Sequence, residues 1–191
     1  MKLILSKTSP YARLAWVVML EKGLEPRLEV VFTQTRILND PLFEIHPSGR
    51  LPCLILDDGT VLEDSPLVCA YLDALDGAPA FAPPQGAALW PHWRREAMAR
   101  SLLDGLAVWV RELRRPEHER SPGIIRHEAE RARRMVAALE RDIGDAVWRG
   151  ALNLPQIVLL TALQIERRMP DFAWREGHPA LLAWEAALAV R

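Results

Sequence analysis

Two serine–proline pairs, Ser9-Pro10 and Ser65-Pro66, mark the places in this chain where chemistry is most readily expected. Serine is a preferred N-cap and proline fits the first helical turn, so each pair predicts the start of a helix. A helix N-terminus exposes unpaired N–H groups and the positive end of the helix dipole, and it therefore stabilises anions. We predict two anion-binding helix starts.

The two helix starts suit different chemical groups. At the first, the Ser9 hydroxyl can donate a hydrogen bond to a bound thiolate, which lowers a thiol pKa from about 8.5 toward neutrality. At the second, Ser65 and neighbouring backbone N–H groups can hold a carboxylate, while Asp64 can pair with an ammonium group. A ligand with a thiol and an α-amino-acid head would match both. The alternative for either serine is helix capping alone, worth about 1 kcal/mol.

The segment 49–52 (GRLP) lies between these two sites in the sequence. A proline after a glycine loop and before a strand is a candidate cis-proline, because X-Pro bonds lower the cis penalty to about 1 kcal/mol. A cis bond before Pro52 would turn the Leu51 backbone outward to pair with an extended peptide. Arg50, or Arg36 in the preceding loop, could neutralise a terminal carboxylate.

Apolar periodicity and turn residues predict the elements that hold these groups. The predicted order is a strand at 2–5, a helix at 10–22, a strand at 28–32, an irregular loop at 33–51, a hairpin of 53–56 and 60–62, and a helix at 65–76. The hairpin rests on an Asp-Gly pair between apolar runs. This half of the chain is therefore a β-α-β unit followed by a hairpin and a helix.

The second half of the chain has only helical patterns. Residues 77–86 (GAPAFAPPQG) carry three prolines and two glycines, as an interdomain linker does. The helices that we predict after it span 89–113, 124–143, 154–169 and 180–190, and Asn153 with Gln156 can form a neutral capping box. On the first helix we expect one inward face with Trp93, Ala97, Leu102, Leu106, Trp109 and Leu113. On the second, arginines alternate with glutamates, which predicts a solvated face with ion pairs. The predicted organisation is a domain at 1–76, a linker at 77–86 and an all-helical domain at 87–191.

Composition restricts the partners of the protein. The 191 residues are 50% hydrophobic, and 24 basic against 25 acidic side chains leave a net charge of -1, which predicts neither nucleic-acid nor membrane binding. The five histidines are scattered, so we expect them on the surface and expect no metal site. Cys53 and Cys69 fit buried thiols. Without a visible signal peptide or membrane span, we expect a cytoplasmic protein.

Three motifs together resemble the N-terminal domain of bacterial glutathione S-transferases. They are 8–13 (TSPYAR), 46–52 (HPSGRLP), and 62–66 (LEDSP) with Tyr71-Leu72. Their order, their spacing and the linker to a helical region extend the resemblance over nearly the whole chain. It implies an α/β thioredoxin-like domain followed by an all-α bundle, in a serine-type member of the family.

The resemblance also implies roles for the motif residues. Ser9 would activate the glutathione sulfur, the Leu51 backbone would bind the cysteinyl unit, Pro52 would be the cis-proline, and Asp64 with Ser65 would bind the γ-glutamyl head. Serine in place of cysteine at position 9 argues against thiol-transferase chemistry, because a hydroxyl cannot form a mixed disulfide. Three departures from the family pattern are His46 in place of Asn, Arg100 in place of Asp, and a short stretch at 144–150.

The expected activity is attack of glutathione on an apolar electrophile, as in detoxification. Conjugation is the simplest outcome, and isomerisation, peroxide reduction or dehalogenation would use the same thiolate. Tyr11, Met98, Leu102 and Trp109 are the residues that we expect at the apolar substrate, and the family implies a homodimer. Two alternatives remain: a non-catalytic ligand- or protein-binding module, and a glutaredoxin-like reductase that would need Cys53 or Cys69 at the sulfur.

Overall fold

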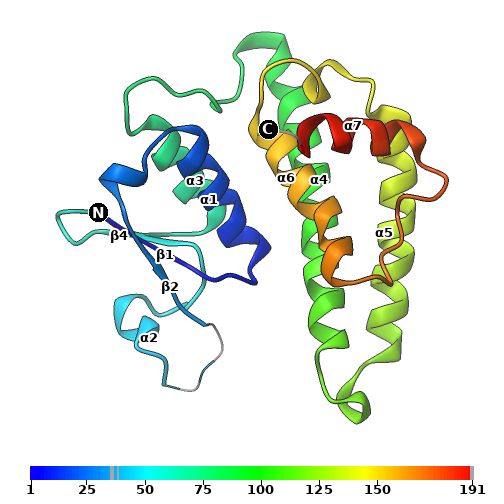
Figure 1. Cartoon of the computed structure of the whole chain (residues 1–191), viewed down its shortest axis with the longest axis horizontal. Helices are drawn as coiled ribbons and strands as arrows, with labels where there is room; N and C mark the ends of the chain where they lie inside the picture. The colour runs from blue at the N-terminus through cyan, green and yellow to red at the C-terminus, as the bar shows by residue number, and fades with distance from the viewer. Residues whose placement is uncertain (35–36, 38, 190–191) are drawn as a thin grey trace. The chain divides into compact units, whose positions relative to one another are not determined.

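The computed structural model of the chain describes residues 1–34, 37 and 39–189. Within them the chain divides into two compact units, Met1–Ala82 and Pro83–Arg191 (Figure 1). The first unit contains strands β1 (Lys2–Leu5), β2 (Glu29–Phe32), β3 (Cys53–Ile55) and β4 (Val61–Glu63), and helices α1 (Pro10–Glu21), α2 (Leu42–Ile45) and α3 (Ser65–Ala74). The predicted β-α-β unit, hairpin and helix are confirmed.

The four strands form one mixed sheet in the order β2-β1-β3-β4. β1 runs parallel to β2, while β3 runs antiparallel to both β1 and β4. α1 and α3 lie together on one face of the sheet and α2 lies on the other (Figure 1). Together with the helices of the second unit, this confirms the expected fold class, an α/β thioredoxin-like part followed by an all-α part.

Strand alternation divides the core of the first unit between the two faces of the sheet. Leu3 and its partner Leu54 are fully buried on one face. Ile4 and its partner Cys53 point the other way, where they pack with Leu42 of α2 in a cluster that also contains Leu51. The Leu51–Pro52 segment is thus anchored by an apolar side chain at the edge of a strand.

Two details of the first unit differ from the sequence prediction. The irregular loop at 33–51 contains the short helix α2, whose start is held by the Asp40 carboxylate, which accepts a 2.9 Å hydrogen bond from the Leu42 N–H. One turn is too short for an amphipathic pattern to reveal. In addition, the N-cap of α3 is Asp64, with Ser65 already inside the helix.

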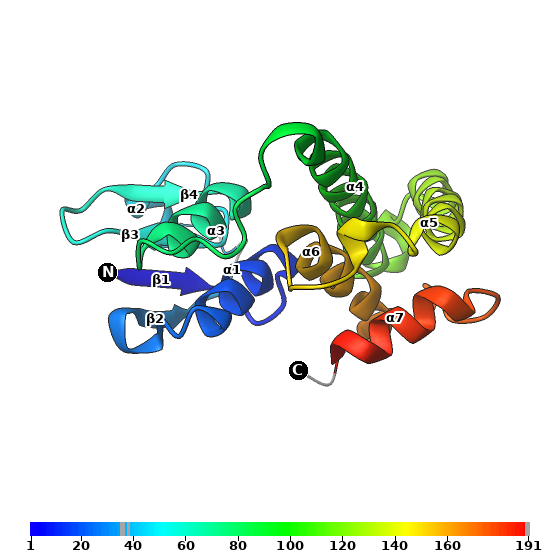
Figure 2. The same ribbon diagram turned by 90° about the horizontal axis from the view of Figure 1, so that it is seen from above.

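The second unit is helical throughout its regular structure. Its helices are α4 (Leu89–Leu113), α5 (Pro122–Asp142), α6 (Leu154–Leu163) and α7 (Pro179–Ala189). α4 packs against α5 and α6, and α7 lies against both α5 and α6 (Figure 2). The capping box of Asn153 and Gln156 is confirmed. The apolar run at 154–169 is not one helix, because the α-helix ends at Leu163 and continues as a 3-10 turn over Gln164–Arg168.

Exposure along α4 corrects the face predicted for this helix. Leu102, Leu106 and Trp109 are buried, but Trp93 is 45% exposed and Ala97 is also exposed. At about 100° per residue, positions 93 and 97 lie opposite the buried stripe. Two histidines are likewise buried against expectation, His46 and His92. No helix in the described part of the chain is long and apolar enough to cross a membrane.

Candidate functional site

The strand register brings the predicted site segments to one edge of the sheet. Ile4 pairs with Cys53, and Cys53 pairs with Glu63, so one row of residues crosses β1, β3 and β4. Adjacent strands lie about 4.8 Å apart. β1 therefore leads into the Ser9 loop at the same edge where β3 begins after Pro52 and where β4 leads into Asp64.

Ser9 forms the N-cap of α1 and keeps a donor for a ligand. Its Oγ accepts a 3.2 Å hydrogen bond from the Ala12 N–H, and its carbonyl accepts the first helical bond, 3.2 Å from the Arg13 N–H. The side chain is half-buried, and no residue that the structure describes accepts a hydrogen bond from its hydroxyl. Capping and donation to an anion are therefore compatible, because capping uses an oxygen lone pair and donation uses the proton.

The Leu51–Pro52 peptide bond is cis, as predicted. The Leu51 side chain is buried in the cluster on the α2 face. Within residues 1–34, 37 and 39–189, neither the N–H nor the C=O of Leu51 is bonded to another backbone group. Backbone groups left unpaired at a sheet edge can bind an extended peptide by strand-like hydrogen bonds.

Asp64 and Ser65 form the start of α3. The Asp64 carboxylate accepts a 2.8 Å hydrogen bond from the Ser65 N–H, and the Asp64 carbonyl accepts one from Val68. Asp64 is exposed and has a positive φ of 75°, a region that a non-glycine residue rarely adopts and that is concentrated at functional sites. Ser65 is only 2% exposed. An exposed carboxylate beside a helix N-terminus can bind a ligand that carries both charges.

The two arginines proposed as carboxylate partners have different standings. Arg50 is exposed, and its backbone N–H donates a 3.2 Å hydrogen bond to the Ser48 Oγ. Its positive charge, after the Ser48 hydrogen bond and His46, favours a lowered pKa of Glu63 at the end of β4. Arg36 lies outside the described residues, and its role stays a prediction.

Sequence reasoning missed a polar cluster beside this edge. The His46 Nδ1 lies 2.8 Å from the Glu63 Oε2 and 3.1 Å from the Ser48 Oγ, and the Ser48 hydroxyl donates to the same Glu63 oxygen. The hydrogen bond from Ser48, with the neighbouring His46 and Arg50, holds the pKa of the Glu63 carboxyl below its ordinary value. His46 and Ser48 lie in one loop, but Glu63 is 15 residues beyond Ser48, and the β3–β4 pairing brings it back to them.

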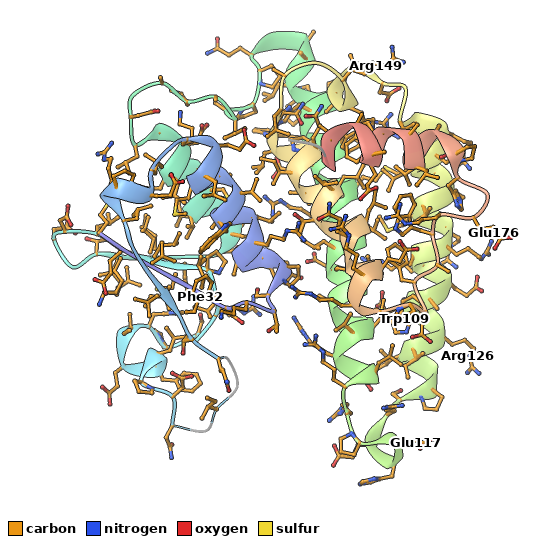
Figure 3. All side chains as sticks on the ribbon, in the orientation of Figure 1. Phe32, Trp109, Glu117, Arg126, Arg149 and Glu176 are labelled. Atoms are coloured by element: carbon orange, nitrogen blue, oxygen red, sulfur yellow. The ribbon has the colours of Figure 1, made fainter. Side chains whose placement is uncertain are left out.

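An aromatic surface at the same edge was also missed. Phe32 ends β2 opposite Leu5 and is 44% exposed (Figure 3). Its ring centroid lies 5.1 Å from that of Trp16 and 5.6 Å from the Lys7 Nζ. The loop before Ser9 therefore borders an apolar ring with a cation above it.

The cysteines are both buried, as predicted. Burial, together with the nearby Glu63 carboxylate, raises the pKa of the Cys53 thiol to about 11. Only the thiolate is a good nucleophile, so this thiol is inert at neutral pH. The reductase alternative loses its best candidate. No group of three potential metal ligands occurs among the residues that the structure describes.

The residues proposed for the apolar substrate come from both units. Tyr11 lies in the first turn of α1 and is half-buried. Met98 is half-buried on α4 with its sulfur 3.9 Å from the Arg95 Nη1, whereas Leu102 and Trp109 are buried on the same helix. Their common role at a substrate stays a prediction.

A family model described as the N-terminal domain of glutathione S-transferase matches residues 8–75. A glutathione S-transferase from Methylobacillus flagellatus KT, solved with glutathione bound, is 30% identical with a TM-score of 0.83, and the match covers 100% of this chain and 95% of that one. The chain belongs to the glutathione S-transferase family.

Two further relatives have similar identity. A glutathione transferase family member from Pseudomonas fluorescens Pf-5, solved with glutathione, is 28% identical with a TM-score of 0.88, over 100% of this chain and 94% of that one. The uncharacterized GST-like protein YibF of Escherichia coli K12 is 28% identical over 164 residues, which are 85% of this chain and 80% of YibF. The similarity therefore extends through both units.

Proposed function

We propose that this chain binds glutathione along one edge of its sheet and activates the thiol with Ser9. The observation that carries this proposal is the register row Ile4–Cys53–Glu63, which gathers the Ser9, Leu51–Pro52 and Asp64–Ser65 segments. The Leu51 backbone pairs with the cysteinyl unit, and the start of α3 holds the γ-glutamyl head. Arg50, or Arg36, is the proposed partner of the terminal carboxylate.

Ser9 acts by stabilising the anion of the bound thiol. Its hydroxyl proton donates to sulfur while its oxygen still caps α1, and the helix dipole adds to the effect. The thiol proton passes to solvent, and the thiolate then attacks an electrophilic carbon. The C–S bond forms as the bond to the leaving group breaks, and that group departs with the electron pair. The reaction is accelerated because more of the bound thiol is ionised and because the sulfur is held close to the electrophile.

Conjugation of an apolar electrophile is the reaction that we propose first. A second structure of the Pseudomonas fluorescens protein, 29% identical to this chain, contains S-(propanoic acid)-glutathione, in which the sulfur carries a carbon substituent. That ligand has the connectivity of a conjugation product. Of the residues expected at the apolar substrate, we propose Tyr11 in the first unit and Met98 in the second, each of which is partly exposed, whereas Leu102 and Trp109 are buried in the second unit. The exposed ring of Phe32 adds an aromatic surface near the sulfur end.

We also propose a homodimer. Trp90 is 69% exposed and, with Trp93, lines an open hollow of about 670 Å³ on α4, and the two rings meet edge to face at 5.4 Å. Exposed tryptophans are typical of interface cores. Light scattering at micromolar concentration should give twice the chain mass of 21.6 kDa. A monomer mass would contradict the proposal.

The first test is calorimetric titration with reduced glutathione beside the Ser65→Ala variant. Saturable binding that weakens in the variant supports the site, and an activated aryl halide then tests turnover. If no heat and no thermal shift occur up to millimolar glutathione, the fold has lost this ligand. If glutathione binds and no electrophile in a broad panel reacts, the chain is a binding module.

A further inference from the structure

A cluster of three side chains joins the loop that precedes β3 to the end of β4. The cluster consists of His46, Ser48 and Glu63, and we call it the clasp. The Glu63 Oε2 receives both the His46 Nδ1, at 2.8 Å, and the Ser48 hydroxyl. His46 and Ser48 belong to the loop that leads directly to Leu51, while Glu63 directly precedes Asp64. The clasp therefore connects two segments of the proposed glutathione site.

In the part of the chain that the structure describes, the His46 ring makes its polar contacts with the other two members of the clasp. His46 is 5% exposed, and its Nε2 is buried without a hydrogen-bond partner among the described residues. The polar contacts of its ring are therefore made at Nδ1. A carboxylate only accepts hydrogen bonds, so Nδ1 carries a proton and donates it to Glu63. The His46 imidazole therefore acts as a hydrogen-bond donor through Nδ1 alone.

Ser48 extends the clasp to the backbone of the loop. Its Oγ donates to Glu63 and accepts a 3.2 Å hydrogen bond from the Arg50 N–H. Between them, Gly49 has a φ of +58°, and a Cβ there would meet the Phe43 ring at 2.4 Å. The Ser48 hydroxyl thus links Glu63 to the backbone of the residue that precedes Leu51.

The negative charge of Glu63 strengthens the hydrogen bonds of the clasp at neutral pH. The Ser48 hydrogen bond and the neighbouring His46 and Arg50 lower the pKa of Glu63, so its carboxyl is ionised. Cys53, the strand partner of Glu63, keeps its proton, since burial and Glu63 raise its pKa to about 11. The two charged neighbours that shift the pKa of Glu63, His46 and Arg50, both favour its ionised form.

We propose that His46, Ser48 and Glu63 are positioning residues that set the spacing between the Leu51 backbone and the start of α3, and thereby the affinity for glutathione. This inference rests on the proposed function. A ligand that bridges two segments binds tightly only when their spacing is fixed beforehand, because otherwise binding must order the loop. Among the described residues, no hydrogen bond of the clasp involves Ser9, so we expect its effect to fall on affinity.

The test compares Glu63→Gln with Glu44→Gln. Glu44 is an exposed glutamate of α2 without an ion pair in the described residues, so its variant removes the same charge from the same region. Glu63→Gln should weaken glutathione binding about tenfold by calorimetry, the usual scale for losing a charge-assisted hydrogen bond. Glu44→Gln should bind like the wild type. The pKa of the bound thiol, followed by thiolate absorbance, should be the same in all three proteins.

Position 46 provides a rescue pair. His46→Asn places an amide donor close to the position of Nδ1 and should keep the glutathione Kd within about threefold of the wild type, whereas His46→Leu should lose about tenfold. If Glu63→Gln or His46→Leu fails to fold, Ser48→Ala tests the clasp in its place. Adding Glu63→Gln to His46→Leu should cost little more, because one network is broken twice.

The results separate the clasp from the proposed function. If the wild type binds glutathione and Glu63→Gln and His46→Leu bind equally well, or lose only thermal stability, the clasp proposal is overturned. If the wild type does not bind glutathione, the proposed function fails. Hydrogen exchange of the amides at 49–51 then judges the clasp, since it must quicken in Glu63→Gln and not in Glu44→Gln.

Discussion

The two helix starts that frame the proposed site share a Ser-Pro sequence and differ in construction. At α1, Ser9 is itself the N-cap and its hydroxyl oxygen takes the Ala12 N–H. At α3, Asp64 is the cap, with a positive φ, and Ser65 is buried inside the first turn. The same dipeptide therefore begins a helix that is capped by its own serine hydroxyl in one place and by the carboxylate of the preceding residue in the other.

In the proposed function, this difference assigns thiol activation to the start of α1 and binding of the amino-acid head to the start of α3. A half-buried hydroxyl can donate to a thiolate without adding charge, which suits activation of sulfur. An exposed carboxylate beside a helix N-terminus offers an acceptor for an ammonium group and donors for a carboxylate, which suits an amino-acid head. We expect variants at α1 to change turnover and variants at α3 to change affinity.

The largest expected effect is on turnover at the α1 start. Ser9→Ala should lower the rate with an aryl halide on the order of 100-fold, as loss of one donor to a developing or bound anion typically does. The glutathione Kd should change less than about twofold, and the pKa of the bound thiol should rise toward about 8.5.

A matched control for Ser9 lies in the second unit. Ser121 caps α5 ahead of Pro122, and its Oγ accepts a 3.3 Å hydrogen bond from the Ile124 N–H, as Ser9 does from Ala12. Ser121→Ala removes an equivalent cap away from the proposed chemistry. If it lowers turnover as much as Ser9→Ala, Ser9 acts only through helix stability.

The next effect is on affinity at the α3 start. Ser65→Ala should weaken glutathione binding about tenfold, which is about 1.4 kcal/mol. The reason is that the carboxylate of the γ-glutamyl head loses a buried hydroxyl as its hydrogen-bond partner. Turnover at saturating glutathione should be nearly unchanged. Calorimetry and steady-state kinetics check the two parts, and a fall in kcat without a change in Kd would reverse the assignment.

A smaller effect is expected at Asp64. Asp64→Asn keeps a good N-cap and a side chain that tolerates positive φ, so the free energy of unfolding should change by less than about 0.5 kcal/mol. Removing the charge should weaken glutathione binding about three- to fivefold, since an exposed ion pair contributes about 1 kcal/mol at most. Unaltered binding at low salt would show that the carboxylate only caps the helix.

The smallest expected effect is on stability, and it compares the cap of α1 with the cap of α3. Ser9→Ala and Ser121→Ala should each lower the free energy of unfolding by about 1 kcal/mol. Ser65→Ala should lose less through capping, because Asp64 holds that position. Denaturant unfolding of the three variants measures this order. Equal losses would mean that the hydroxyl of Ser65 supports α3 as strongly as the two caps support their helices.

Much of the first unit could be predicted because its signals are local. We could predict β1, α1, the hairpin and α3 from apolar runs, the Asp57–Gly59 turn and the Ser-Pro pairs. The cis bond before Pro52 followed from a glycine loop that meets a strand. α2 was missed because a single turn held by Leu42 and Asp40 has no periodicity to detect.

The second unit shows where periodicity misleads. The arginine-rich face of α5 was anticipated and carries pairs such as Arg133 with Glu130. On α4, however, Trp93 was assigned by its apolar character to a face that neighbouring helices leave open. Which side of a long helix is covered depends on its partners, α5 and α6, and not on the helix alone.

The sequence by itself determined the order of elements and the chemical types at the proposed site, since caps, turns and apolar alternation act over a few residues. Only the tertiary structure decided what those residues meet. The pairing of Cys53 with Glu63 carries a carboxylate to His46, a histidine that local pattern placed on the surface. Strand pairing joins residues that are distant in sequence, and it also decides which of them are buried. The contacts of His46 and Ser48 with Glu63 therefore could not be predicted from local sequence patterns.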